Sequence, residues 1–219
     1  SNRGRAMGQW RADIANAEAE ITYDCMSDPD TAVEEEEDDD LFEIAGGAVI
    51  PLQPVHTTFR LLGCALTSGG QNMPITSLLT IGDDTHSPWG SLSDPVGGNI
   101  NDGQQRNFDA GVVDTGLEMS ITGRSYTTRH SFYMEKSSSP PNQNVLVLRD
   151  GDSVPDIRGF DGQDNIEAYI QSYIDTTTNT VTLEDNQAIF LFELGTSNLN
   201  SSAADFQDMV ILVTMTPSE

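Results

Sequence analysis

An acidic turn in the second half of the chain carries the residues best suited to chemistry. Asp150, Asp152 and Asp156 follow one another at spacings of two and four, around Gly151 and Pro155. Carboxylate oxygens spaced in this way within a tight turn can surround a hard cation such as calcium. Asp150, Asp152 and Asp156 are therefore the candidate ligands of a calcium site. The alternative is an ordinary turn that leads out of a strand over 144–149.

This stretch resembles the aspartate-rich calcium loops of thrombospondin type 3-like repeats, in which Asp-x-Asp-Gly-x-Pro-Asp recurs. It departs from that pattern because Ser153 stands in place of a glycine and because only one copy is present. It also departs from an EF-hand loop, since Val154 occupies a ligand position and the closing glutamate is missing. Calcium is the one cofactor that the sequence suggests, and we expect it to bind weakly.

Two further groups of residues are candidates for binding. His86 lies beside Asp83 and Asp84, with Asp94 nearby, and such a set can hold a transition metal. The three histidines are far apart in sequence, however, which favours an ordinary surface or strand histidine. A cationic and aromatic cluster can hold a sugar or an acidic partner, although internal pairing with carboxylates is favoured: Arg124, Tyr126, Arg129, His130, Phe132 and Tyr133.

The chain lacks the patterns that are typical of hydrolytic enzymes. No Gly-x-Ser-x-Gly motif occurs, so no serine nucleophile is indicated. A pair of opposed carboxylates, as in glycoside hydrolases, is not informative among 35 acidic residues. We therefore expect a protein that is not an enzyme.

The charge of the chain excludes two classes of partner. Its 35 acidic residues outnumber ten basic ones, of which only Lys136 is a lysine, and the formal net charge is −25. Nucleic acids and anionic membrane surfaces are bound through lysine and arginine, so neither is expected as a partner. Abundant Thr, Ser, Asn and Gly suit an extracellular or cell-surface β protein, and the acidity also fits adaptation to salt.

The two cysteines, Cys25 and Cys64, are an even number in a chain that looks exported. We therefore expect a disulfide between them, which would join the N-terminal segment to the first clear strand. Closing a loop of about 40 residues would stabilise the fold by ~3–4 kcal/mol. The alternative is two buried thiols.

We expect three parts: a helical segment over 1–26, an acidic linker over 27–40 and a β-sandwich domain over 41–219. The linker holds seven consecutive carboxylates, Glu34 to Asp40, which are typical of a solvated loop. Arg3 and Arg5 fit a position just outside a removed targeting or anchor segment. An apolar stripe at helical spacing is predicted to mediate assembly, with packing on its own domain as the alternative: Met7, Trp10, Ile14, Ala17 and Ile21.

The region from residue 41 onward has the pattern of a mainly β protein, which we expect to be a jelly-roll-like β-sandwich. Turn residues separate ten candidate strands: 48–52, 56–67, 74–81, 106–113, 117–127, 130–136, 144–149, 180–184, 187–194 and 207–215. The runs 187–194 and 207–215 are nearly continuous in apolar residues and are therefore predicted to be central strands. One short late helix is predicted from residues at helical spacing: Ile166, Tyr169, Ile170, Tyr173 and Ile174.

Three segments resemble a family of uncharacterised exported or surface proteins of bacteria: 147–156 (VLRDGDSVPD), 190–196 (FLFELGT) and 204–214 (ADFQDMVILVT). The resemblance extends over roughly residues 55–215. It implies export and a shared fold. It implies no catalytic residues, because the family has no assigned activity.

These observations lead to two hypotheses of function. The first is a non-enzymatic extracellular structural protein, a subunit of a surface layer, appendage or filament that assembles with copies of itself. The alternative is an extracellular adhesion module that binds calcium or a carbohydrate.

Overall fold

The computed structural model describes residues 40–154, 170–175 and 177–218. The chain divides into two units, Ser1–Asp38 and Asp39–Glu219, and every described residue belongs to the second. The expected N-terminal helix and Cys25 lie outside the described residues, so the bounds 1–26, 27–40 and 41–219 remain predictions. In the described part of the chain, no helix has the length and apolar character needed to span a membrane.

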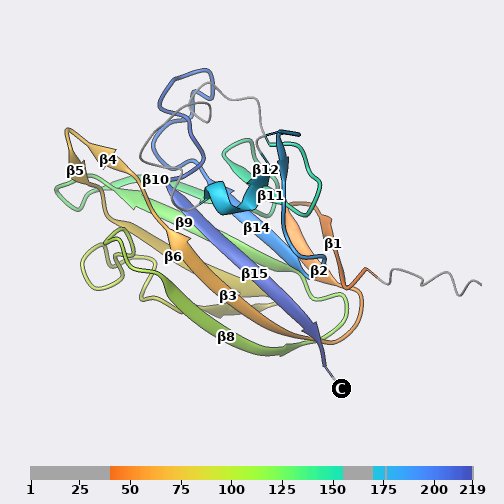
Figure 1. Ribbon diagram of the computed structural model, residues 1–219. Helices are drawn as coiled ribbons and strands as arrows, with labels where there is room; N and C mark the ends of the chain where they lie inside the picture. The colour runs from red at the N-terminus through yellow and green to blue at the C-terminus, as the bar shows by residue number, and fades with distance from the viewer. Residues whose placement is uncertain (1–39, 155–169, 176, 219) are drawn as a thin grey trace, which may run out of the picture. The chain divides into compact units, whose positions relative to one another are not determined.

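The described region is mainly β, which confirms the fold class at that level, and its strands pair antiparallel (Figure 1). The larger sheet follows the order β1-β2-β9-β6-β7, with β10 beside β9. Its strands are β1 Phe42–Ala45, β2 Ala48–Pro51, β6 Ile75–Ile81, β7 Asp84–His86, β9 Met119–Tyr126 and β10 Phe132–Ser137.

The second sheet has five strands in the order β11-β14-β15-β3-β8. They are β3 Val55–Gly63, β8 Arg106–Val113, β11 Val145–Leu148, β14 Gln187–Phe192 and β15 Met209–Pro217. Two small ribbons complete the described elements: β4 Thr67–Ser68 with β5 Gln71–Asn72, and β12 Ile174–Asp175 with β13 Thr180–Val181.

The two main sheets share one hydrophobic core. Alternate residues of β9, among them Met119 and Ile121, are buried, as the two-residue period of a strand requires. Gly123 lies on the same face, and a Cβ added there would come within 2.7 Å of the Met209 side chain and 3.3 Å of the Phe192 ring. Strand β9 therefore lies directly against β14 and β15, and glycine permits this close approach.

Strand β14 and most of β15 in the five-stranded sheet are buried on both faces. Strands β14 and β15 are both interior, as the continuous apolar runs predicted. Phe190 and Ile211 face the shared core, whereas Ile189 and Leu212 face a second apolar cluster. Ile170 and Val181 belong to that second cluster, and Ile174 of β12 packs against it. Burial of successive residues explains why these two strands show no polar alternation.

The predicted late helix is wrong at its C-terminal end. Residues 155–169 lie outside the described part, but Gln171–Tyr173 form only a short 3-10 turn (η1) and Ile174 begins strand β12. Ile174 pairs with Val181, and Tyr173 accepts a backbone hydrogen bond from Thr182. Pairing across the ribbon overrides the helical spacing, because isoleucine and tyrosine are also favourable in strands. The apolar stripe is nevertheless used, since Ile170 is buried in the second cluster.

Candidate functional site

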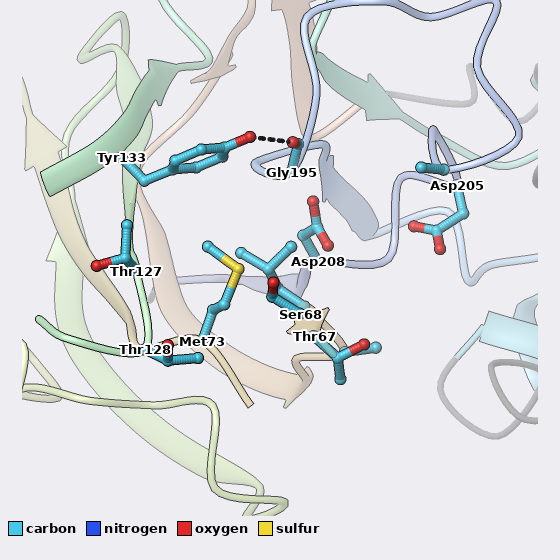
Figure 2. A pocket seen from close by; sticks show the side chains of 12 residues that line it. Thr67, Ser68, Met73, Thr127, Thr128, Tyr133, Gly195, Asp205 and Asp208 are labelled. Carbon is cyan, nitrogen blue, oxygen red and sulfur yellow. Dashed lines mark hydrogen bonds between the residues drawn. The ribbon is translucent and has the colours of Figure 1, made fainter. Parts of the chain in front are cut away.

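A cavity of about 460 Å³ lies next to the loop that joins β14 to β15. Three stretches of chain that are distant in sequence form its wall: 65–73, 127–133 and 195–208 (Figure 2). Hydroxyl groups come from the β4 region, the β9–β10 turn and β10: Thr67, Ser68, Thr127, Thr128 and Tyr133. The β14–β15 loop adds Asp205 and Asp208, and Met73 and Leu66 supply apolar surface.

A fully buried glutamate, Glu193, holds this loop in place. It directly follows β14, where its Oε1 accepts hydrogen bonds from the backbone N–H groups of Gly195 (3.0 Å) and Thr196 (2.9 Å). Its Oε2 accepts from the N–H of Asp205 at 2.9 Å. A buried carboxylate needs such partners, since burial without hydrogen bonds is costly. Glu193 therefore ties the two ends of the loop to the end of β14.

Asp208 lies at the other end of the loop, immediately before β15. Its side chain is buried, and Oδ2 accepts a hydrogen bond from the N–H of Leu194 at 2.5 Å. The antiparallel register places Phe192 opposite Met209, which brings Glu193 and Asp208 together at adjacent strand ends. The pairing of two strands thus places two carboxyl groups at the pocket.

The pKa values of Asp205 and Asp208 are raised. Burial, followed by the negative charges of Glu193 and Asp205, holds the pKa of Asp208 well above its ordinary value. Burial is also the main cause that raises the pKa of Asp205 to about 6, although the backbone N–H of Gln207 partly opposes it. Both carboxyl groups therefore retain their protons to higher pH than an ordinary aspartate does.

The opposite walls of the pocket are fixed by side-chain hydrogen bonds. The buried Asn101 amide donates to the backbone oxygens of Leu66 (2.7 Å) and Met73 (2.9 Å), which secures the β4–β5 hairpin. The Tyr133 hydroxyl donates to the backbone oxygen of Gly195 at 3.0 Å (Figure 2). The pocket is thus framed before any ligand arrives, as is usual for small-molecule sites.

The predicted calcium turn has a structural use in the described residues. The Asp150 Oδ1 accepts from the N–H of Leu183 at 2.8 Å, and the Asp152 Oδ2 accepts from the N–H of Arg149 at 2.9 Å. Asp156 lies outside the described residues. Within those residues, no group of three or more His, Cys, Asp and Glu side chains is arranged to hold a metal. Calcium at Asp150, Asp152 and Asp156 stays a prediction.

The other sequence candidates have ordinary surroundings. The His86 ring packs against Phe108, with ring centres 5.8 Å apart. The Asp94 carboxylate accepts hydrogen bonds from the N–H groups of Val96 and Gly97, which lower its pKa.

Arg124 pairs internally, as favoured from the sequence. It donates through Nε to Glu135 at 2.7 Å, and its guanidinium lies 5.6 Å from the Phe132 ring centre. Only Tyr133 of this cationic and aromatic cluster lines the pocket.

Cys64 is buried, and burial raises the pKa of its thiol. Its expected partner, Cys25, lies outside the described residues, so the disulfide stays a prediction.

Sequence reasoning missed Glu193, Asp205 and Asp208 as a group. One signal was present, because Glu193 and Asp208 directly flank the two most apolar strands, where a charge is unusual. All three also lie within the segments 190–196 and 204–214 that carry the family resemblance.

No protein-family model matches this chain, and no curated protein or solved structure matches it significantly.

Proposed function

We propose that the protein is a non-enzymatic extracellular module that binds carbohydrate in the pocket beside the β14–β15 loop. The observation that carries this proposal is the lining of that pocket, in which five hydroxyl-bearing side chains and two carboxyl groups surround a cavity of about 460 Å³. Extracellular placement is supported by the composition and by the resemblance of residues 147–156, 190–196 and 204–214 to exported proteins.

The lining suits a ligand rich in hydroxyl groups. Serine and threonine hydroxyls both donate and accept hydrogen bonds, and carboxylates accept them from sugar hydroxyls. Met73 and the ring of Tyr133 offer apolar surface for the C–H faces of a sugar. The volume falls within the range of roughly 300–1,000 Å³ that is usual for small-ligand pockets.

Titration with a panel of monosaccharides and oligosaccharides tests the proposal. We expect Tyr133→Ala to weaken binding about tenfold, because the residue lines the pocket and bonds to Gly195. Phe132→Ala is the matched control, since Phe132 is an exposed neighbour on β10 that is not part of the lining. Equal binding by both variants, or no binding by the parent protein, would contradict the proposal.

The proposal that the protein is not an enzyme needs its own assay. Two carboxyl groups in a sugar pocket also resemble the machinery of glycoside hydrolases. We expect bound oligosaccharides to be recovered intact after prolonged incubation, as judged by chromatography. Release of reducing ends that is abolished by Asp208→Asn would establish hydrolysis instead.

The second candidate is a structural subunit of a surface layer, appendage or filament. Exposed apolar side chains on the β region favour it, including Val112 of β8, which is 59% exposed. Strand β8 is an edge strand of its sheet: it pairs with β3 on one side, and no strand of the described residues pairs with its other side. The shared core of the two sheets also supports the finer fold proposal, a jelly-roll-like β-sandwich.

Deletion of residues 1–24 tests assembly. If the stripe of Met7, Trp10, Ile14, Ala17 and Ile21 joins subunits, the truncated protein should be a folded monomer, whereas the full chain assembles once salt screens its charge of −25. Light scattering and electron microscopy at low and high salt decide this. A full chain that stays monomeric at high salt would contradict it.

A further inference from the structure

The pocket is acidic, and its own wall supplies no cation. Among the described residues that line it, Asp205 and Asp208 carry carboxyl groups and none is Lys, Arg or His. Glu193 lies directly behind them: a Cβ added to Gly195 would be 3.3 Å from the Glu193 Oε1 and 3.4 Å from the Asp208 Oδ2. The carboxyl groups of Asp205 and Asp208 thus line one side of the cavity, and Glu193 lies behind that wall.

We infer that the pocket binds an amino sugar, a hydroxylated ring whose protonated amino group lies against Asp205 and Asp208. This inference rests on the proposed carbohydrate-binding function and specifies the ligand. The hydroxyl groups of Thr67, Ser68 and Thr128 are available to the ring, on walls formed by other segments than the acidic loop.

Charge is the reason to expect an ammonium group. Glu193 already has three close backbone partners on its two oxygens, so its charge is held in place without a ligand. Asp205 and Asp208 are destabilised as carboxylates mainly by burial, which raises the pKa of both, and further by the charge of Glu193. An ammonium group offers strong charge-assisted hydrogen bonds and offsets the mutual repulsion.

A bare metal ion fits the same carboxyl groups less well. No set of three or more metal-binding side chains converges among the described residues, and this includes Glu193, Asp205 and Asp208. A cavity of about 460 Å³ is also far larger than an ion requires. A ligand that brings one positive group and a ring to fill the remaining space matches both observations.

Ammonium binding should release protons. Because a nearby cation favours the ionised carboxyl, the pKa values of Asp205 and Asp208 should fall when the ligand enters. Below about pH 6 the free pocket holds an additional proton on Asp205, so binding of the amine should weaken there. A neutral sugar would show neither effect.

The test is calorimetry on the full chain near pH 7 with glucosamine, glucose and N-acetylglucosamine, which differ in charge but share the ring. We expect glucosamine to bind at least tenfold more tightly than the two neutral sugars, with a heat that depends on the ionisation enthalpy of the buffer. Asp205→Asn should remove that preference, since the amide keeps the acceptor for the Gln207 N–H but loses the charge. Asp83→Asn, a change of equal charge at an exposed site, is the control.

Each outcome has a distinct meaning. Equal affinity for the three sugars would overturn the amino-sugar inference and leave the proposed function standing. Absence of binding by all three, in a protein that is folded by circular dichroism, would overturn both. Calcium binding that Asp205→Asn abolishes, without any preference for glucosamine, would make the pocket a metal site and overturn the inference. A preference that persists in Asp205→Asn or is lost in Asp83→Asn would also overturn it.

Discussion

Glu193→Gln should destabilise the fold more than its small change in shape suggests. The glutamine oxygen can keep the hydrogen bonds from Gly195 and Thr196, but the amide nitrogen then faces the backbone N–H of Asp205. The amide nitrogen of the new glutamine and the N–H of Asp205 are both donors, and they would face each other where the Glu193 carboxylate accepts a hydrogen bond at 2.9 Å. The fully buried site leaves little access for solvent to compensate.

The size of this effect follows from two opposing contributions. A hydrogen bond to a charged group contributes about 1.5–3 kcal/mol, and a buried donor left without a partner costs about 1–3 kcal/mol more. Loss of the Glu193 charge relieves its repulsion of Asp208 and Asp205, which offsets part of the sum. We expect a net loss of about 2–4 kcal/mol, a large fraction of the roughly 5–15 kcal/mol that stabilises a typical domain.

Urea unfolding followed by circular dichroism measures the loss. Glu184→Gln is the matched control, because Glu184 is exposed and precedes the same strand, and its free energy of unfolding should change by less than about 0.5 kcal/mol. If Glu193→Gln were as stable as Glu184→Gln, the carboxylate would not hold the loop, and the account of how the pocket is framed would be refuted.

Three further predictions concern other parts of the chain. The fold favours protonated Asp205, so the contribution of this proton to stability is fully present below the ordinary pKa of 3.8 and is lost as pH rises through about 6. The free energy of unfolding of Asp205→Asn should therefore rise relative to that of the parent between pH 4 and 7. Parallel curves of unfolding free energy against pH would contradict this. Gly123→Ala should cost about 1–3 kcal/mol in urea unfolding, because its Cβ would meet Met209 at 2.7 Å; unchanged stability would mean that the sheets separate easily there. Mass spectrometry without reduction should find Cys25 joined to Cys64, and two alkylatable thiols in folded protein would refute the disulfide.

Local patterns predicted most of the longer strands, but they missed β1, β5, β7 and β12 and several strand ends. Residues 106–113 were expected as a strand and form β8 with those bounds, since turn residues flank both ends. Strand β3 stops at Gly63 although apolar residues continue to Leu66, and the chain then enters the β4–β5 hairpin held by Asn101. Strand β7 was not predicted, because three polar residues, Asp84–His86, show no strand pattern and are a strand only through their pairing with β6.

The sequence by itself determined properties that depend on composition and on near neighbours. Alternation and apolar runs specify a mainly β chain with β14 and β15 inside a sheet, because a strand's faces repeat every two residues. The net charge of −25 is likewise the same in any fold, and the expectation that polyanions are not partners rests on it alone.

Only the tertiary structure decided where the candidate site lies. Glu193 and Asp208 read as two among 35 acidic residues until antiparallel pairing places Phe192 opposite Met209 and buries both carboxyl groups. Burial raises the pKa of Asp208, and the Tyr133 hydroxyl donates a hydrogen bond to Gly195, beside these carboxyl groups, from β10, 62 residues away along the chain. Contacts over such separations depend on strand pairing across two sheets, and no local periodicity encodes them.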